Sequence, residues 1–108
     1  MSLFSNALGC LTGSASSSAK AAREKGATII DVRGHDEWAD GHLEDSTLMP
    51  LPELAQRVGE IVKLVGGDKT KPIVIVCRSG GRAGQARSLL LQHGFTDVVN
   101  GGGWTSLR

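Results

Sequence analysis

The chain has 108 residues, of which 40% are hydrophobic and 21% charged, and these proportions suit a globular domain with a single core. Twelve Lys and Arg residues against eleven Asp and Glu residues give a net charge of +1, which disfavours a nucleic-acid-binding module because such modules depend on clustered positive charge. Two cysteines are too few for a disulfide-stabilised scaffold, and the longest unbroken apolar run, residues 73–77, is far too short to span a membrane.

Residues 1–15 are expected to form a flexible or cloning-derived N-terminal segment ahead of one domain at residues 16–108. The segment contains Leu8-Gly9-Cys10, which resembles a bacterial lipoprotein cleavage box, but the apolar run before it is short and no Lys or Arg precedes it. Because the signal-peptide pattern is incomplete, the cytoplasm is the expected location. Cys10 is interpreted as an inert thiol, and the alternative is a resolving thiol that forms a disulfide with the second cysteine.

The first half of the domain alternates helical and strand-like segments. Three serines at 16–18 offer N-caps for a helix over residues 19–25. A strand rich in β-branched residues is predicted over residues 28–32, followed by a single helical turn over 36–40 and a weak strand over 46–49.

The second half begins with a helix that has Pro52 in its first turn. Its apolar residues form one stripe with a period of 3.6, namely Leu54, Val58, Ile61, Val62 and Val65. Residues 73–76 show no alternation and therefore indicate a central strand covered on both faces.

A helix over residues 82–93 follows, with Ala83, Ala86 and Leu90 on one side and Gly94 as its C′ residue. A last strand is predicted over 97–100, with the glycines at 101–103 as a turn. The alternation predicts an α/β fold with a small, mainly parallel central sheet and helices on both faces.

The segment after the central strand carries the chemistry, because ligands of parallel α/β sheets bind where strands lead into helices. Cys77 stands there, followed by Arg78, Ser79, Gly80, Gly81 and Arg82. The glycines allow successive N–H groups to turn inward, and the next helix and both arginines add positive charge with no acid nearby in sequence. Cysteines in such surroundings ionise more readily than free thiols, so Cys77 is interpreted as a nucleophile and residues 78–82 as its anion-binding cradle.

The alternative for Cys77 is a small core residue, which is disfavoured because two flanking arginines make full burial costly. Asp31 is interpreted as a cap for backbone N–H groups, and Arg33 as a partner of Glu37 or of another carboxylate that holds the loops around the site. The two tryptophans are expected to fill the edges of the core, and the alternative for Trp104 is the mouth of the site. The three histidines are scattered in the sequence, so no metal site is expected.

Four segments, in this order, resemble the rhodanese homology domain, a family of sulfurtransferases, over roughly residues 16–106. They are Asp31-Val32-Arg33, Glu37-Trp38 with Gly41-His42-Leu43, the loop at 77–82, and Gly101-Gly102-Gly103-Trp104. The sequence departs from the family pattern at Glu44-Asp45-Ser46, where a Pro-Gly-Ala turn is usual. We expect that departure to change the shape of the neighbouring loop.

The resemblance implies that the Cys77 thiolate attacks a sulfane sulfur, as in thiosulfate, and that sulfite leaves. The Cys77 persulfide then passes its outer sulfur to cyanide, a thiol or a protein acceptor, and no cofactor is needed. A basic residue directly after the cysteine, here Arg78, is similar to members that use thiosulfate, whereas members that prefer mercaptopyruvate tend to have a small residue there.

Three alternatives stay open. The domain is a non-catalytic binding or regulatory module, or a sulfur carrier for a protein partner, or a loop-cysteine phosphatase or arsenate reductase of the same fold. Phosphatases of this fold have five residues between Cys and Arg, whereas four separate Cys77 from Arg82. A shorter loop is expected to fit a sulfur atom and to crowd a phosphoryl group.

Overall fold

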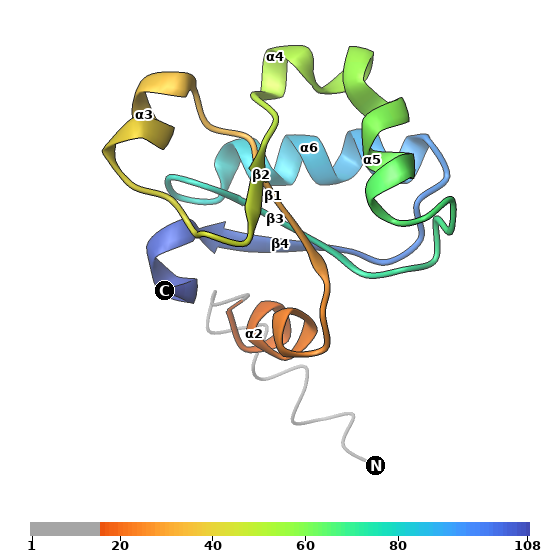
Figure 1. The fold of residues 1–108 in the computed structure, drawn as a ribbon, viewed down its shortest axis with the longest axis horizontal. Coiled ribbons are helices and arrows are strands. Elements are labelled where there is room, and N and C mark those ends of the chain that lie inside the picture. The colour runs from red at the N-terminus through yellow and green to blue at the C-terminus, as the bar shows by residue number, and fades with distance from the viewer. Residues whose placement is uncertain (1–15) are drawn as a thin grey trace.

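A single four-stranded parallel sheet, in the order β2-β1-β3-β4, organises the computed structural model, which describes residues 16–108 (Figure 1). The strands are β1 (Thr28–Asp31), β2 (Ser46–Leu48), β3 (Ile73–Cys77) and β4 (Val98–Gly103). All five residues of β3 are buried, as expected for a central strand with apolar residues on both faces. The predicted α/β fold with a parallel sheet is confirmed.

Helices cover both faces of this sheet (Figure 1). They are α2 (Ser16–Glu24), α3 (His35–Asp40), α4 (Leu51–Leu54), α5 (Val58–Leu64) and α6 (Gly81–Gln92), with 3₁₀ turns η1 (Ala55–Arg57) and η2 (Trp104–Leu107). One face packs against α4, α5 and α6, and the opposite face against α2 and η2. Within residues 16–108 the structure has no helix with the length and apolar character needed to cross a membrane.

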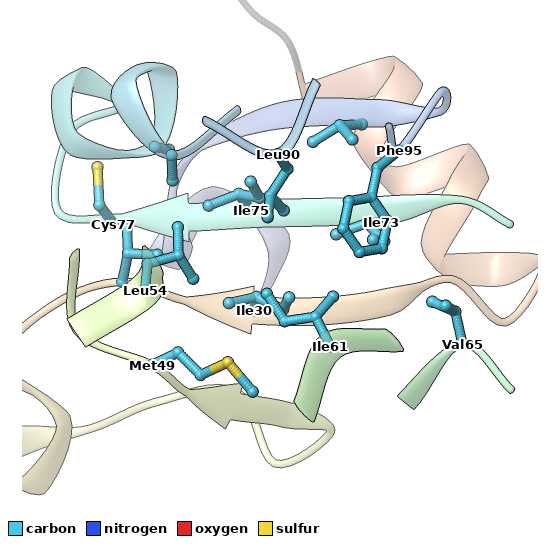
Figure 2. Packing of buried hydrophobic residues seen from close by; sticks show 14 residues of the cluster. Ile30, Met49, Leu54, Ile61, Val65, Ile73, Ile75, Cys77, Leu90 and Phe95 are labelled. Atoms are coloured by element: carbon cyan, nitrogen blue, oxygen red, sulfur yellow. The ribbon is translucent and has the colours of Figure 1, made fainter. Parts of the chain in front are cut away.

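The larger core cluster lies between the sheet and α4, α5 and α6 (Figure 2). Its fully buried side chains include Ile30, Ile61, Ile75, Leu90 and Phe95. The alternating side chains of β3 point to the other face, where Val74 and Val76 pack with Ala19 and Leu107. The chain therefore builds one sheet with two thin apolar layers, and the carboxyl end of β3 is held rigidly from both sides.

The predicted helix from Pro52 is wrong in its continuity. Residues 51–64 form α4, the 3₁₀ turn η1 and α5, and Arg57 leaves the helical region with φ −110° and ψ 13°. Its guanidinium bonds Glu53 at 3.2 Å and Glu60 at 3.0 Å, one on each side of the interruption. The apolar stripe still packs on one cluster, so periodicity could not reveal the break.

The predicted turn at glycines 101–103 is also wrong, because all three lie in β4. A Cβ atom on Gly101 would sit 2.8 Å from Val74 Cγ1 and 3.0 Å from Val76 Cγ1. The residue is therefore glycine because β4 lies close against the side chains of its neighbour β3, and not because the chain reverses there. The pairing of β3 with β4 shifts register between Ile75 and Cys77, which brings Gly103 opposite Cys77.

Candidate active site

Cys77 is the last residue of β3, as the sequence predicts, and its side chain is 1% exposed. Figure 2 shows its sulfur turned toward the ribbon that leads into α6. The Gly80 N–H donates a hydrogen bond to Cys77 Sγ at 2.9 Å. The chain between them thus curls over the sulfur, and the structure brings Cys77 and Gly80 together at one point.

Cys77 is buried although two arginines flank its loop, so the prediction that they make its burial costly is wrong. Arg78 is exposed, and Arg82 is half-buried with its charge paired to a carboxylate. Neither guanidinium is buried with the sulfur, so neither adds a desolvation penalty at Cys77.

The loop over the sulfur ends in the N-terminus of α6. Gly80 has φ +103°, a left-handed conformation that side chains other than glycine rarely adopt, and α6 begins at the next residue. The first N–H groups of a helix have no partner within it and carry the positive end of its dipole. Of the predicted cradle at residues 78–82, the structure shows one backbone donor on the sulfur, the Gly80 N–H, whereas the side chains of Arg78 and Ser79 are exposed.

Asn100 of β4 fixes one peptide of this loop, and sequence reasoning missed it. Its Nδ2 donates to the Gly80 carbonyl at 3.0 Å, and its Oδ1 accepts the Gly102 N–H at 2.8 Å. The Gly84 N–H, also at 3.0 Å, completes the coordination of the Gly80 carbonyl. Because a trans peptide is planar, the N–H of Gly81 points away from these donors, on the side opposite Asn100.

Arg82 is not the free cation that the sequence suggested. Its guanidinium bonds both carboxylate oxygens of Glu37, at 2.7 and 2.9 Å, and the two side chains are 36% and 33% exposed. The hydrogen bond from Arg82, with a second one from the Gly34 N–H, lowers the pKa of Glu37 to about 2. The same pairing raises the pKa of Arg82, to which the nearby Cys77 adds a smaller contribution. Arg82 therefore ties the start of α6 to α3.

The Glu37 pairing gives a pH-dependent prediction. The pKa of Glu37 falls from 4.5 to about 2 on folding, so the pair stabilises the protein above pH 4.5 and its contribution is lost as the pH falls toward 2. Glu37→Gln is expected to lower the free energy of unfolding by about 1 kcal/mol at pH 7. Urea unfolding of both proteins between pH 7 and 2 measures this difference. A gap that stays constant down to pH 2 would contradict the assignment.

A buried ion pair holds the neighbouring loop. Asp31 and Arg33 are 0% and 3% exposed, and Arg33 Nη2 lies 2.8 Å from Asp31 Oδ2. Asp31 also accepts the Arg33 backbone N–H, so its predicted capping role is confirmed. Arg33 pairs with Asp31, and not with the Glu37 carboxylate. Its remaining donors bond the carbonyls of Glu37 and Gly41, which agrees with the predicted role in holding the loops.

The segment that departs from the expected turn is anchored to α2. Asp45 accepts two hydrogen bonds from Arg23, at 2.9 and 2.8 Å, and Arg23 also donates to the carbonyl of Leu107. The side-chain hydrogen bond from Arg23 lowers the pKa of Asp45. This contact joins the loop at 44–46 to α2 and the C-terminal turn on the face opposite the larger core.

A pocket of about 320 Å³ opens beside the cysteine loop, lined by Arg33, Glu37, Asp40, Arg78 and Trp104. The centroid of the Trp104 ring lies 4.7 Å from the Arg33 guanidinium carbon. A Cβ on Gly41 would lie 3.1 Å from Trp104 Cη2. Trp104 packs against the smaller core cluster, as predicted, and it also lines the mouth of the pocket, which was the alternative interpretation. Nowhere in residues 16–108 do three His, Cys, Asp or Glu side chains gather closely enough to hold a metal ion. Cys10 lies outside the described residues.

A family model for the rhodanese-like domain matches residues 15–107. Thiosulfate sulfurtransferase GlpE of Pseudomonas syringae is 35% identical over 86 residues, which are 78% of this chain and 76% of that protein. The tRNA uridine(34) hydroxylase of Hamiltonella defensa is 32% identical over 82 residues, but these are 74% of this chain and only 23% of that protein. A solved structure described as a rhodanese with anions from Escherichia coli superposes with a TM-score of 0.65 at 30% identity, over 73% of this chain and 88% of the other.

Proposed function

The chain belongs to the rhodanese-like domain family, and we propose that it is a sulfurtransferase that carries sulfane sulfur as a persulfide on Cys77. One observation carries the proposal, the 2.9 Å hydrogen bond from the Gly80 N–H to Cys77 Sγ at the start of α6. A donor at that position supports negative charge on the sulfur, and a persulfide is negatively charged as well.

Thiosulfate is the proposed donor. Cys77 Sγ attacks its outer sulfur, the sulfur–sulfur bond of thiosulfate breaks, and the bonding electron pair leaves with sulfite. The anionic Cys77 persulfide then gives its outer sulfur to cyanide or to a thiolate, which regenerates the Cys77 thiolate and yields thiocyanate or a new persulfide. Neither step needs a general base once the attacking groups are ionised.

In this proposal the backbone of the loop stabilises the sulfur anion, and an arginine side chain binds the donor. The N–H groups of residues 78–82 and the dipole of α6 stabilise the sulfur anion in the resting enzyme and in the persulfide. Arg78, which is exposed and lines the pocket, is proposed to bind the sulfonate end of thiosulfate and the departing sulfite. Arg82 supports this loop through Glu37 instead of binding the substrate directly.

The same ion pair argues against phosphoryl transfer. A phosphatase of this kind needs its loop arginine to clamp the phosphoryl oxygens with two N–H groups. In this chain two guanidinium nitrogens of Arg82 already bond Glu37. A sulfur carrier that hands its persulfide to a protein uses the same first half-reaction, so it is a variant of the proposed function.

The test is the intact mass of the purified chain after treatment with thiosulfate. We expect one added sulfur atom, removed by cyanide with release of thiocyanate, and peptide mapping should place it on Cys77. Uptake of sulfur that a thiol removes but cyanide does not would still support a persulfide. A chain that gains no sulfur, or that hydrolyses phosphate esters instead, would overturn the proposal.

A further inference from the structure

The pocket beside the cysteine loop contains four charged side chains, and two of them are already neutralised. Arg33 is paired with Asp31, and Glu37 is paired with Arg82. The other two, Arg78 and Asp40, have no side-chain hydrogen bond or ion pair with any residue in the range 16–108, and both are exposed. The mouth of the site therefore offers one guanidinium and one carboxylate to a ligand.

In this pocket an inorganic dianion meets one cation and one carboxylate that are unpaired within the described part of the chain. Thiosulfate and sulfite gain from Arg78 but are repelled by Asp40, the last residue of α3, whereas the charge of Glu37 is offset by Arg82. A ligand with both a carboxylate and an ammonium group supplies a group of opposite charge for each of Arg78 and Asp40, and it meets no uncompensated repulsion.

The size of the pocket agrees with an organic ligand. Its volume of about 320 Å³ lies at the lower end of the range for small-molecule sites, roughly 300–1,000 Å³, and far exceeds what one thiosulfate ion fills. The Trp104 ring adds an apolar wall to this polar mouth, which can cover the carbon atoms of a short thiol.

Resting on the proposed function, we infer that the sulfur acceptor is a zwitterionic amino-acid thiol, held by its carboxylate on Arg78 and by its ammonium group on Asp40. The acceptor thiolate attacks the outer sulfur of the Cys77 persulfide, the bond between the two sulfurs of Cys77 breaks, and the electron pair returns to Sγ. The products are the persulfide of the acceptor and the Cys77 thiolate, and the thiol proton leaves to solvent. Asp40 thereby becomes a specificity-determining residue.

The experiment follows the second half-reaction alone. The chain is loaded with thiosulfate, freed of excess donor, and mixed with four thiols: cysteine, cysteamine, 3-mercaptopropionate and 2-mercaptoethanol. Cysteine carries both an ammonium group and a carboxylate, and cysteamine carries the ammonium group only. 3-Mercaptopropionate carries the carboxylate only, and 2-mercaptoethanol carries neither. Each thiol is compared with itself between variants, so its own acidity and nucleophilicity cancel. The variants are Asp40→Asn and, as a matched control on the same helix, Asp36→Asn, because Asp36 lies in the first turn of α3 and does not line the pocket.

We expect Asp40→Asn to reduce kcat/KM about fivefold for cysteine and cysteamine, and by less than about twofold for the two thiols without an ammonium group. Asp36→Asn should leave all four thiols within about twofold. Equal effects on all four thiols, or equal effects of the two substitutions, would overturn the inference and leave the proposed function standing. A chain that takes up no sulfur at all would overturn both.

Discussion

Replacing Cys77 with Ser is expected to abolish thiocyanate formation from thiosulfate and cyanide, a loss on the order of 10³-fold or more. A serine hydroxyl cannot form a persulfide, and it is not ionised at neutral pH. The hydroxyl can still accept the Gly80 N–H that now bonds Sγ at 2.9 Å, so the loop is expected to keep its shape. A coupled assay of thiocyanate release, together with intact mass after thiosulfate, measures the effect.

Cys10→Ser is the matched control, because Cys10 is the other cysteine in the sequence. If Cys10 is inert, this variant takes up one sulfur and turns over at the wild-type rate. If it is a resolving thiol, the variant accumulates more persulfide than the wild type and forms no disulfide with Cys77. Residual activity in Cys77→Ser, with sulfur found on Cys10, would contradict the assignment of Cys77 as the nucleophile.

The position of Cys77 at the end of the central strand was predictable from sequence because its signals are local. A five-residue apolar run predicts a buried central strand, and the helix after it shows a clear face of Ala83, Ala86 and Leu90. The first polar loop after such a strand lies at the ligand-binding edge of a parallel sheet. These rules use neighbouring residues only, and the structure confirms both elements to within one or two residues.

The electrostatics of the site were not predictable in the same way. Glu37 and Arg82 are 45 residues apart, and no spacing rule links a short helix to the start of another one. Nothing in the sequence distinguishes Asn100 from the other residues of the predicted last strand, yet its side chain bonds the carbonyl of Gly80, 20 residues away. Both contacts depend on how β4 and α3 reach the loop in space. Because the Glu37 contact was missed, Arg82 was expected to bind a ligand, whereas in the structure it supports the loop.

The glycines at 101–103 show why the turn predicted there from local sequence was wrong. Three consecutive glycines favour a turn on local grounds. In the structure the three glycines have different reasons: Gly101 lies against Val74 and Val76, Gly102 has φ +74°, and Gly103 lies against the backbone of the cysteine loop. Gly103 has φ −73° and ψ 135°, an ordinary extended conformation, so its identity reflects space and not backbone freedom.

Gly103→Ala is therefore expected to damage the site through a steric contact. A Cβ at this position would lie 2.7 Å from the Arg78 carbonyl oxygen, which is backbone, so the loop over Cys77 must shift. A displacement of that kind is expected to lower kcat/KM for thiosulfate by about 10- to 100-fold, because it moves the Gly80 N–H away from the sulfur. The free energy of unfolding should fall by about 1–3 kcal/mol, as for other overpacked sites.

Gly59→Ala separates this effect from a general response to losing a glycine. Gly59 lies in α5, has no positive φ, and a Cβ there would meet nothing within 4 Å. That variant should keep wild-type kinetics and gain about 0.5–1 kcal/mol in stability, since alanine is favoured over glycine within a helix. Thiocyanate kinetics and urea unfolding of both variants make the comparison. If Gly103→Ala were destabilised yet fully active, the loop would tolerate displacement, and the sulfur anion would have to be stabilised by groups other than the backbone of residues 78–82.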